Sequence, residues 1–157
     1  MVSTFIHKIV PLKPPKKNAA EPLYKGKLIL FGEDDPDDEE LLREVFSGID
    51  SSFVLVFRDN GKKILNTFNE LKEEELPCLI VLDYNMPELN GAEILEKLNG
   101  HSRASTIPKI IWSTSGSEIY KKICLEMGAC DYIKKPSNVT ELEKSARYML
   151  SFCTVDK

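Results

Sequence analysis

Acidic side chains follow two of the apolar runs in this sequence. Glu33 and Asp34 come just after LILF at 28–31, and Asp83 comes directly after CLIVL at 78–82. If the two runs are neighbouring strands, the three carboxylates converge and repel one another unless a cation lies among them. Oxygen-only ligands at an open crevice suit Mg²⁺. A carboxylate beside Mg²⁺ can also act as a nucleophile and form an aspartyl phosphate.

Helix capping is the structural alternative for acids that follow a strand. Asp35, Asp37 and Asp38 fit that role at the start of a helix. Capping does not explain Asp83, which ends an apolar strand and is followed by no immediate helix. Asp83 therefore requires a chemical explanation.

Hydroxyl and amino groups stand at the ends of later runs. KIIW is followed by STS at 113–115, and DYI at 131–133 is followed by KKP at 134–136. A single serine or lysine at such a point is usually a turn or solvent-facing residue. Phosphoryl transfer, however, needs mainly positioning and charge neutralisation, which hydroxyl and lysine donors supply. The combination of carboxylates, hydroxyl and Lys-Pro at successive strand ends therefore indicates a phosphoryl-transfer site.

Five short apolar runs alternate with helical patterns from Lys27 onward. The runs lie at 28–31, 53–57, 78–82, 109–113 and 131–133. Consecutive apolar positions are typical of strands buried on both faces of a parallel sheet. Five βα units predict an α/β fold, a doubly wound five-stranded parallel sheet with five helices. The common flavodoxin-like order, 2-1-3-4-5, places the first and third strands at the switch point where such sheets bind ligands.

Composition is that of an ordinary soluble globular protein of 157 residues with a net charge of −4. We expect a single domain at 27–152, an extended basic Pro/Lys-rich arm at 1–26 and a tail at 153–157. Six lysines against one glutamate give residues 1–27 a charge of +5, so the remainder carries −9. The acidic body argues against nucleic acid as a partner.

Location and cysteine chemistry follow from absences in the sequence. No apolar run approaches the roughly 20 residues that span a bilayer, and no secretory signal is recognisable. We therefore expect a cytoplasmic protein with no membrane insertion. The four cysteines show neither CxxC spacing nor nearby histidines, which predicts reduced thiols rather than a zinc site or redox pair. They are Cys78, Cys124, Cys130 and Cys153.

The motifs LFGEDDPDDEELL and LIVLDYNMPELNG, together with KKP, resemble those of the receiver domain of bacterial response regulators. The resemblance covers nearly all of the chain except the arm. It implies that Asp83 is the phosphoacceptor in a Mg²⁺-dependent reaction. Asp34 would bind the metal directly and Glu33 mostly through water, while Asn85 would lend its backbone carbonyl.

The same resemblance assigns roles at the later strand ends. Ser113 and Lys135 would hold the phosphoryl oxygens, and Ser113, Thr114 and Tyr132 would form the switch. The peptide bond before Pro136 is expected to be cis. Serine at 113 and the bulky Thr114 depart from the usual residues and leave the lifetime of the phosphorylated form open.

The implied partners are a sensor histidine kinase or phosphotransfer protein upstream and an undetermined protein target downstream. The chain ends at Lys157, soon after the last helix, so we expect no output domain and a signal that leaves by protein contacts, including a possible homodimer. The resemblance implies a phosphoacceptor switch and no enzyme beyond its own phosphorylation and dephosphorylation chemistry.

Three alternatives belong to other functional classes. An FMN carrier would share the fold, but GEDDPDD after the first strand would repel a phosphate. A haloacid-dehalogenase-type phosphatase needs a second acid two residues after the nucleophile, where this chain has Asn85. A phosphorylation-independent docking module with the receiver fold is the third.

Overall fold

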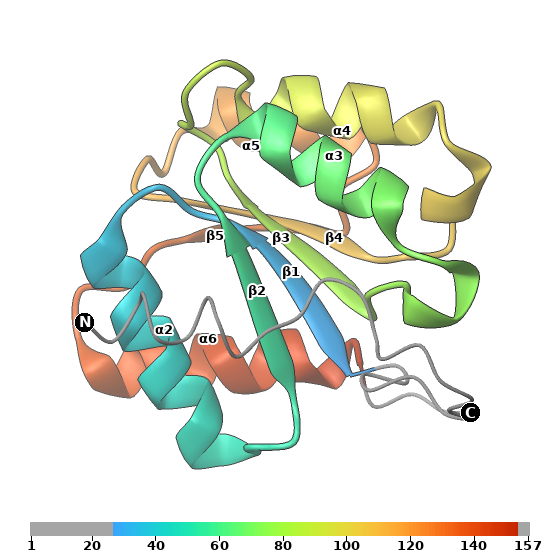
Figure 1. Ribbon diagram of the computed structural model, residues 1–157. Helices are drawn as coiled ribbons and strands as arrows, with labels where there is room; N and C mark the ends of the chain where they lie inside the picture. Colours follow the sequence, from blue (N-terminus) through green and yellow to red (C-terminus); the bar gives the residue numbers. More distant parts are fainter. Residues whose placement is uncertain (1–26, 154–157) are drawn as a thin grey trace, which may run out of the picture.

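The computed structural model describes residues 27–153, so the predicted arm at 1–26 and most of the predicted tail lie outside the described residues. Strands and helices alternate along this part of the chain (Figure 1). The strands are β1 (Leu28–Gly32), β2 (Val54–Arg58), β3 (Leu79–Asp83), β4 (Lys109–Ser113) and β5 (Asp131–Lys134). The α-helices are α2 (Pro36–Ile49), α3 (Gly61–Glu70), α4 (Gly91–Asn99), α5 (Glu118–Glu126) and α6 (Val139–Ser151), with 3₁₀ turns η1 (Glu73–Glu75) and η2 (Ser102–Ala104).

The five strands form one parallel sheet in the order β2-β1-β3-β4-β5. This confirms the predicted doubly wound α/β architecture and its 2-1-3-4-5 order. The register pairs Gly32 with Leu82, so the residues that follow β1 lie beside the last residue of β3. The chain reverses its direction of winding at this point, which is where open α/β sheets bind ligands.

Helices cover both faces of the sheet, with α2 and α6 on one side and α3, α4 and α5 on the other (Figure 1). Successive strand residues point to opposite faces. In β1, for example, Ile29 and Phe31 pack toward α2 and α6, whereas Leu28 and Leu30 pack in the opposite core. Two hydrophobic cores therefore share one sheet, which explains why the strands are apolar at consecutive positions.

Side-chain caps start the helices where the strands end. Asp35 caps α2 by accepting a hydrogen bond from the Asp37 backbone N–H at 2.9 Å. Asn60, Asn90 and Asn138 cap α3, α4 and α6 in the same way. Such caps satisfy backbone N–H groups that the helix leaves unpaired. They fix where each helix begins, and so the length of each loop at the carboxyl edge of the sheet.

Two of the four cysteines are not free thiols. Cys78 and Cys153 form a disulfide across 75 residues of sequence, with their Cα atoms 5.1 Å apart. The prediction that these two cysteines are reduced is wrong. The chain after α6 places Cys153 beside Cys78, the residue just before β3. Cys124 is a buried free thiol and Cys130 an exposed one.

Within residues 27–153, no helix has both the length and the apolar character needed to cross a membrane.

Candidate functional site

The carboxyl ends of β1 and β3 bring three predicted acids together. One oxygen from each of Glu33, Asp34 and Asp83 lies within 4.8 Å of the others. Glu33 and Asp83 are buried, with 2% and 6% of their surface exposed, whereas Asp34 is exposed. The structure therefore brings these three acids together, as the sequence led us to expect. An exposed acid beside two buried ones leaves the cluster open to solvent on one side.

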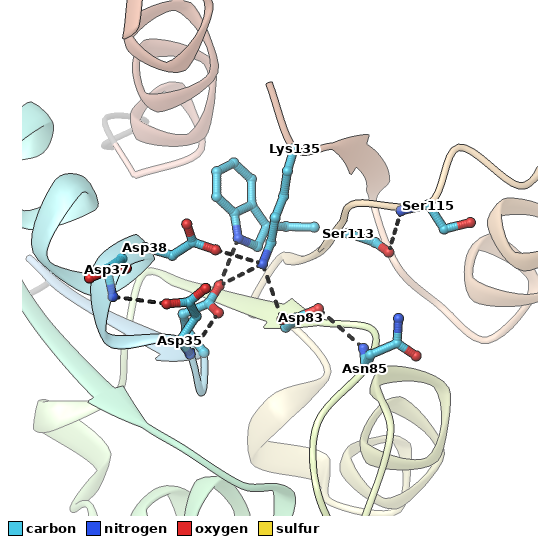
Figure 2. Close-up of polar contacts among 10 residues, drawn as sticks. Asp35, Asp37, Asp38, Asp83, Asn85, Ser113, Ser115 and Lys135 are labelled. Atoms are coloured by element: carbon cyan, nitrogen blue, oxygen red, sulfur yellow. Dashed lines mark hydrogen bonds and ion pairs between the residues drawn. The ribbon is translucent and has the colours of Figure 1, made fainter. Parts of the chain in front are cut away.

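Lys135 lies at the centre of the cluster. Its Nζ is 3.0 Å from Glu33 Oε1, 3.1 Å from Asp83 Oδ2 and 3.1 Å from Asp38 Oδ2. Figure 2 shows the lysine side chain extending from the end of β5 toward Asp38 and Asp83. An ammonium group has three protons, and three carboxylates accept them. One cation thus neutralises part of a site that carries four acids, counting Asp34.

Asp38 joins the site although the sequence suggested a capping role for it. Of Asp35, Asp37 and Asp38, only Asp35 caps α2 with its side chain. Asp38 lies in the first turn of α2 and accepts a hydrogen bond from Lys135. The sequence shows an acid in the first turn of α2, but it does not show where Lys135 lies, so this contact could not be predicted from it.

Burial and charge shift the pKa values of the cluster. Burial raises the pKa of Glu33 to about 7, with Lys135 opposing and Asp83 adding to the shift. Burial also raises the pKa of Asp83, while Lys135 and the hydrogen bond from Asn85 lower it. Burial would lower the pKa of Lys135, but the Glu33 and Asp83 carboxylates raise it above its ordinary value. The neighbouring carboxylates thus keep the Lys135 ammonium in its charged form. A single ammonium does not balance the negative charge of all the acids around it.

The loop after β3 fixes the orientation of Asp83. The Asn85 backbone N–H donates to Asp83 Oδ1 at 3.1 Å, and the Gly91 N–H donates to the Tyr84 carbonyl at 2.8 Å. A Cβ at Gly91 would lie only 3.0 to 3.2 Å from Ile111, Tyr84 and the Asp83 carbonyl, so a larger residue would push the loop away. Asp83 Oδ1 is thus held by the loop and Oδ2 by the lysine.

The predicted switch residues lie on β4, β5 and the loop between β4 and α5. Ser113 is fully buried, and its Oγ accepts a hydrogen bond from the Ser115 N–H at 3.1 Å. Tyr132 is buried, and its hydroxyl donates to the Ser115 carbonyl at 2.8 Å. Thr114 is exposed. Both ends of the predicted switch therefore contact the same residue of the loop.

The peptide bond before Pro136 is trans, which corrects the expected cis bond. The Lys135 backbone N–H donates to the Ser113 carbonyl at 2.7 Å with the trans backbone in place. Trans is the lower-energy form of a bond before proline by about 0.5–1 kcal/mol. Since the trans chain already continues the ladder from β4 and places the lysine in the site, nothing in this geometry requires the cis form.

Trp112 is a site residue that sequence reasoning did not single out. It precedes Ser113 on β4, and its indole Nε1–H donates to Glu33 Oε1 at 3.1 Å. The Lys135 Nζ lies 5.6 Å from the centre of its ring. In the run KIIWS, the sequence predicts only an ordinary core residue at this position. The register of β3 with β4 pairs Trp112 with Asp83, and this pairing reveals its contact with the acids.

Comparison with known proteins identifies the family of this chain. The sequence model of a family described as the response regulator receiver domain matches residues 29–147. The chain belongs to this family. One relative, the two-component response regulator ORR5 of Oryza sativa subsp. japonica, is 36% identical over 110 residues, which are 69% of this chain and 80% of that protein.

Two solved receiver structures resemble the fold closely. The phosphorylated cyanobacterial phytochrome response regulator RcpA aligns with a TM-score of 0.73 at 25% identity, covering 81% of this receiver and 93% of that chain. The Mn²⁺-bound form of the response regulator Rcp1 aligns with a TM-score of 0.72 at 27% identity, covering 83% and 97%. The receiver fold and the two-component family are therefore shown for this chain.

Proposed function

We propose that this receiver accepts a phosphoryl group on Asp83 from the phosphohistidine of a sensor kinase or phosphotransfer protein. The observation that supports this proposal is the position of the Asp83 carboxylate. It ends β3, contacts Lys135 at 3.1 Å and lies within 4.8 Å of two other acids, one of which is exposed. A buried carboxylate beside a lysine and a group of oxygen donors has the environment of a phosphoryl acceptor.

The donor set fits Mg²⁺, which prefers hard oxygen ligands and retains several waters. Asp34 and Asp83 would hold the ion directly, Asn85 would add its backbone carbonyl, and Glu33 would act mostly through water. The exposure of Asp34 and the burial of Glu33 are consistent with this division. The metal would supply positive charge to the phosphoryl oxygens and to the crowded carboxylates.

In the proposed reaction, a carboxylate oxygen of Asp83 attacks the phosphorus atom from the side opposite the histidine. The new O–P bond forms as the P–N bond breaks, and the electron pair of that bond stays on the imidazole nitrogen. Lys135 moves one N–H from Asp83 Oδ2 to a phosphoryl oxygen. The Ser113 hydroxyl donates to another, since that serine follows the residue paired with Asp83. These donors stabilise charge that develops during transfer.

The proposed switch runs through the loop between β4 and α5. When Ser113 turns toward the phosphoryl group, the hydrogen bond from the Ser115 N–H to its Oγ breaks, and Tyr132 loses the position of its acceptor on the same residue. Thr114, exposed between them, would set access to the phosphoryl group. The surface of α5, β5 and α6 would then change its affinity for a protein target or a second copy of the chain. Exposed Ile119 on α5 supports this choice of surface.

We further propose that residues 27–152 form the receiver domain, that the chain acts in the cytoplasm, and that it is not an enzyme acting on a separate substrate. The test is intact mass after incubation with acetyl phosphate, with and without Mg²⁺, in wild type and in Asp83→Asn. We expect one phosphoryl adduct that requires both the metal and Asp83. An adduct of equal yield in Asp83→Asn would place the acceptor elsewhere. Absence of any adduct, even with phosphohistidine donors and short cold incubations, would favour a docking module.

A further inference from the structure

The indole of Trp112 occupies an unusual place for a core side chain. It is 2% exposed and packs in the core between the sheet and the pair α2 and α6, yet its one polar atom faces the acid cluster. The Nε1–H donates to Glu33 Oε1 at 3.1 Å. A buried tryptophan N–H needs an acceptor. Here the acceptor is an acid that the proposed function assigns to the metal site.

Glu33 receives three hydrogen bonds, from a backbone N–H, an indole N–H and an ammonium group. The Asp35 backbone N–H donates to Oε2 at 3.1 Å, while Trp112 and Lys135 both approach Oε1. Lys135 also contacts Asp38 and Asp83, so its ammonium is shared among three acids. If the lysine turns toward a phosphoryl oxygen, its contact with Glu33 weakens. The Trp112 bond comes from a residue of β4 and does not involve the lysine.

We propose that Trp112 is a positioning residue for the metal site. Its N–H holds Glu33 Oε1 in place, so that the carboxylate stays oriented toward the crevice whichever partner Lys135 contacts. The catalytic part of this role rests on the proposed function, whereas the bond itself does not. Groups that orient the ligands of a metal site in this way commonly change metal affinity by about 10–100-fold when they are removed.

The first experiment observes the bond directly by NMR. Trp112 is the single tryptophan of the chain, so the full-length protein gives one indole N–H resonance, which the Trp112→Phe variant identifies by its loss. In wild type we expect a resonance shifted downfield and protected from exchange. In Glu33→Ala the shift should move upfield and exchange should accelerate about tenfold or more, because the acceptor has gone. An indole resonance that is unchanged in Glu33→Ala would overturn the proposal.

The second experiment measures Mn²⁺ and Mg²⁺ affinity by calorimetry in Trp112→Phe, which keeps an aromatic ring and removes the donor. We expect affinity to fall about tenfold or more. The rate of adduct formation should fall at low Mg²⁺ and recover at saturating Mg²⁺, because the defect lies in binding. The matched control is Phe46→Leu, a loss of aromatic volume from the same core at a residue with no polar atom. It should bind the metals like wild type.

A double-mutant cycle separates positioning from packing. If Trp112 acts through Glu33, Trp112→Phe should weaken metal binding in the wild-type background and have no further effect in Glu33→Ala. Equal weakening in both backgrounds, or wild-type affinity in Trp112→Phe, would overturn the proposal. A wild-type protein that binds neither ion and forms no adduct would instead overturn the proposed function and the metal role with it. The indole resonance would still distinguish this result from the absence of the bond.

Discussion

The strongest prediction concerns the lysine that three acids share. Lys135→Met keeps an unbranched side chain of similar length and removes the ammonium. The Nζ lies 3.0 to 3.1 Å from three carboxylate oxygens, and the lysine side chain is only 11% exposed. Removing one partner of a buried ion pair costs about 3–5 kcal/mol because the other charge remains buried and unpaired. We expect the free energy of unfolding at pH 7, measured without metal, to fall by that amount.

The pH dependence of this loss has a definite sign. Burial raises the pKa of Glu33 to about 7 from an ordinary value of 4.5, and Lys135 opposes the shift, so removing the lysine raises the pKa further. A carboxyl group whose pKa is higher in the folded state stabilises the protein below its unfolded pKa, and this stability is lost as the pH rises through the folded pKa. The variant should therefore suffer most at pH 7 and above, and the loss should shrink by at least about half at pH 5.

Urea unfolding in EDTA, followed by circular dichroism at pH 5 and pH 7, measures both quantities. Lys134→Met is the matched control, since Lys134 is the adjacent lysine in the sequence and its side chain is exposed, and it should change stability by less than about 0.5 kcal/mol. Adding Mg²⁺ should restore part of the stability of Lys135→Met, because the ion supplies charge to the same acids. A loss smaller than about 1 kcal/mol, or an equal loss at both pH values, would show that the lysine does not neutralise this cluster.

Three further predictions test other parts of the structure. Cys153→Ser should destabilise the oxidised protein by about 4 kcal/mol, since its bond to Cys78 closes a long loop, and wild type treated with reductant should match the variant in urea unfolding. Absorbance titration should find one tyrosine with a pKa of about 12, since Tyr148 donates to Asp131, and Asp131→Asn should lower that pKa; an identical titration curve would exclude the bond. Burial raises the pKa of Cys124 to about 11, so maleimide should modify it in the folded protein at less than about a tenth of the rate in urea, and equal rates would contradict its burial.

Much of the fold was determined by local sequence. Runs such as LILF and CLIVL are short and apolar at every position, which is typical of strands buried on both faces, and the patterns between them have helical spacing. Five such units have one common strand order, so the neighbouring positions of Glu33, Asp34 and Asp83 could be predicted from motifs at strand ends. These features depend on residues adjacent in the chain and on general rules of sheet topology.

The remaining features depend on distances between segments that sequence patterns do not encode. The contact of Trp112 with Glu33 arises from the register of β4 against β3, and the choice of Asp38 as a third acceptor for Lys135 arises from the rotation of α2 above the sheet. The disulfide between Cys78 and Cys153 needs the end of α6 beside the start of β3. Local sequence thus determined which groups stand at the carboxyl edge of the sheet. Only the packing of helices and strands decided which atoms meet there, because ångström-scale contacts depend on how whole elements lie against one another.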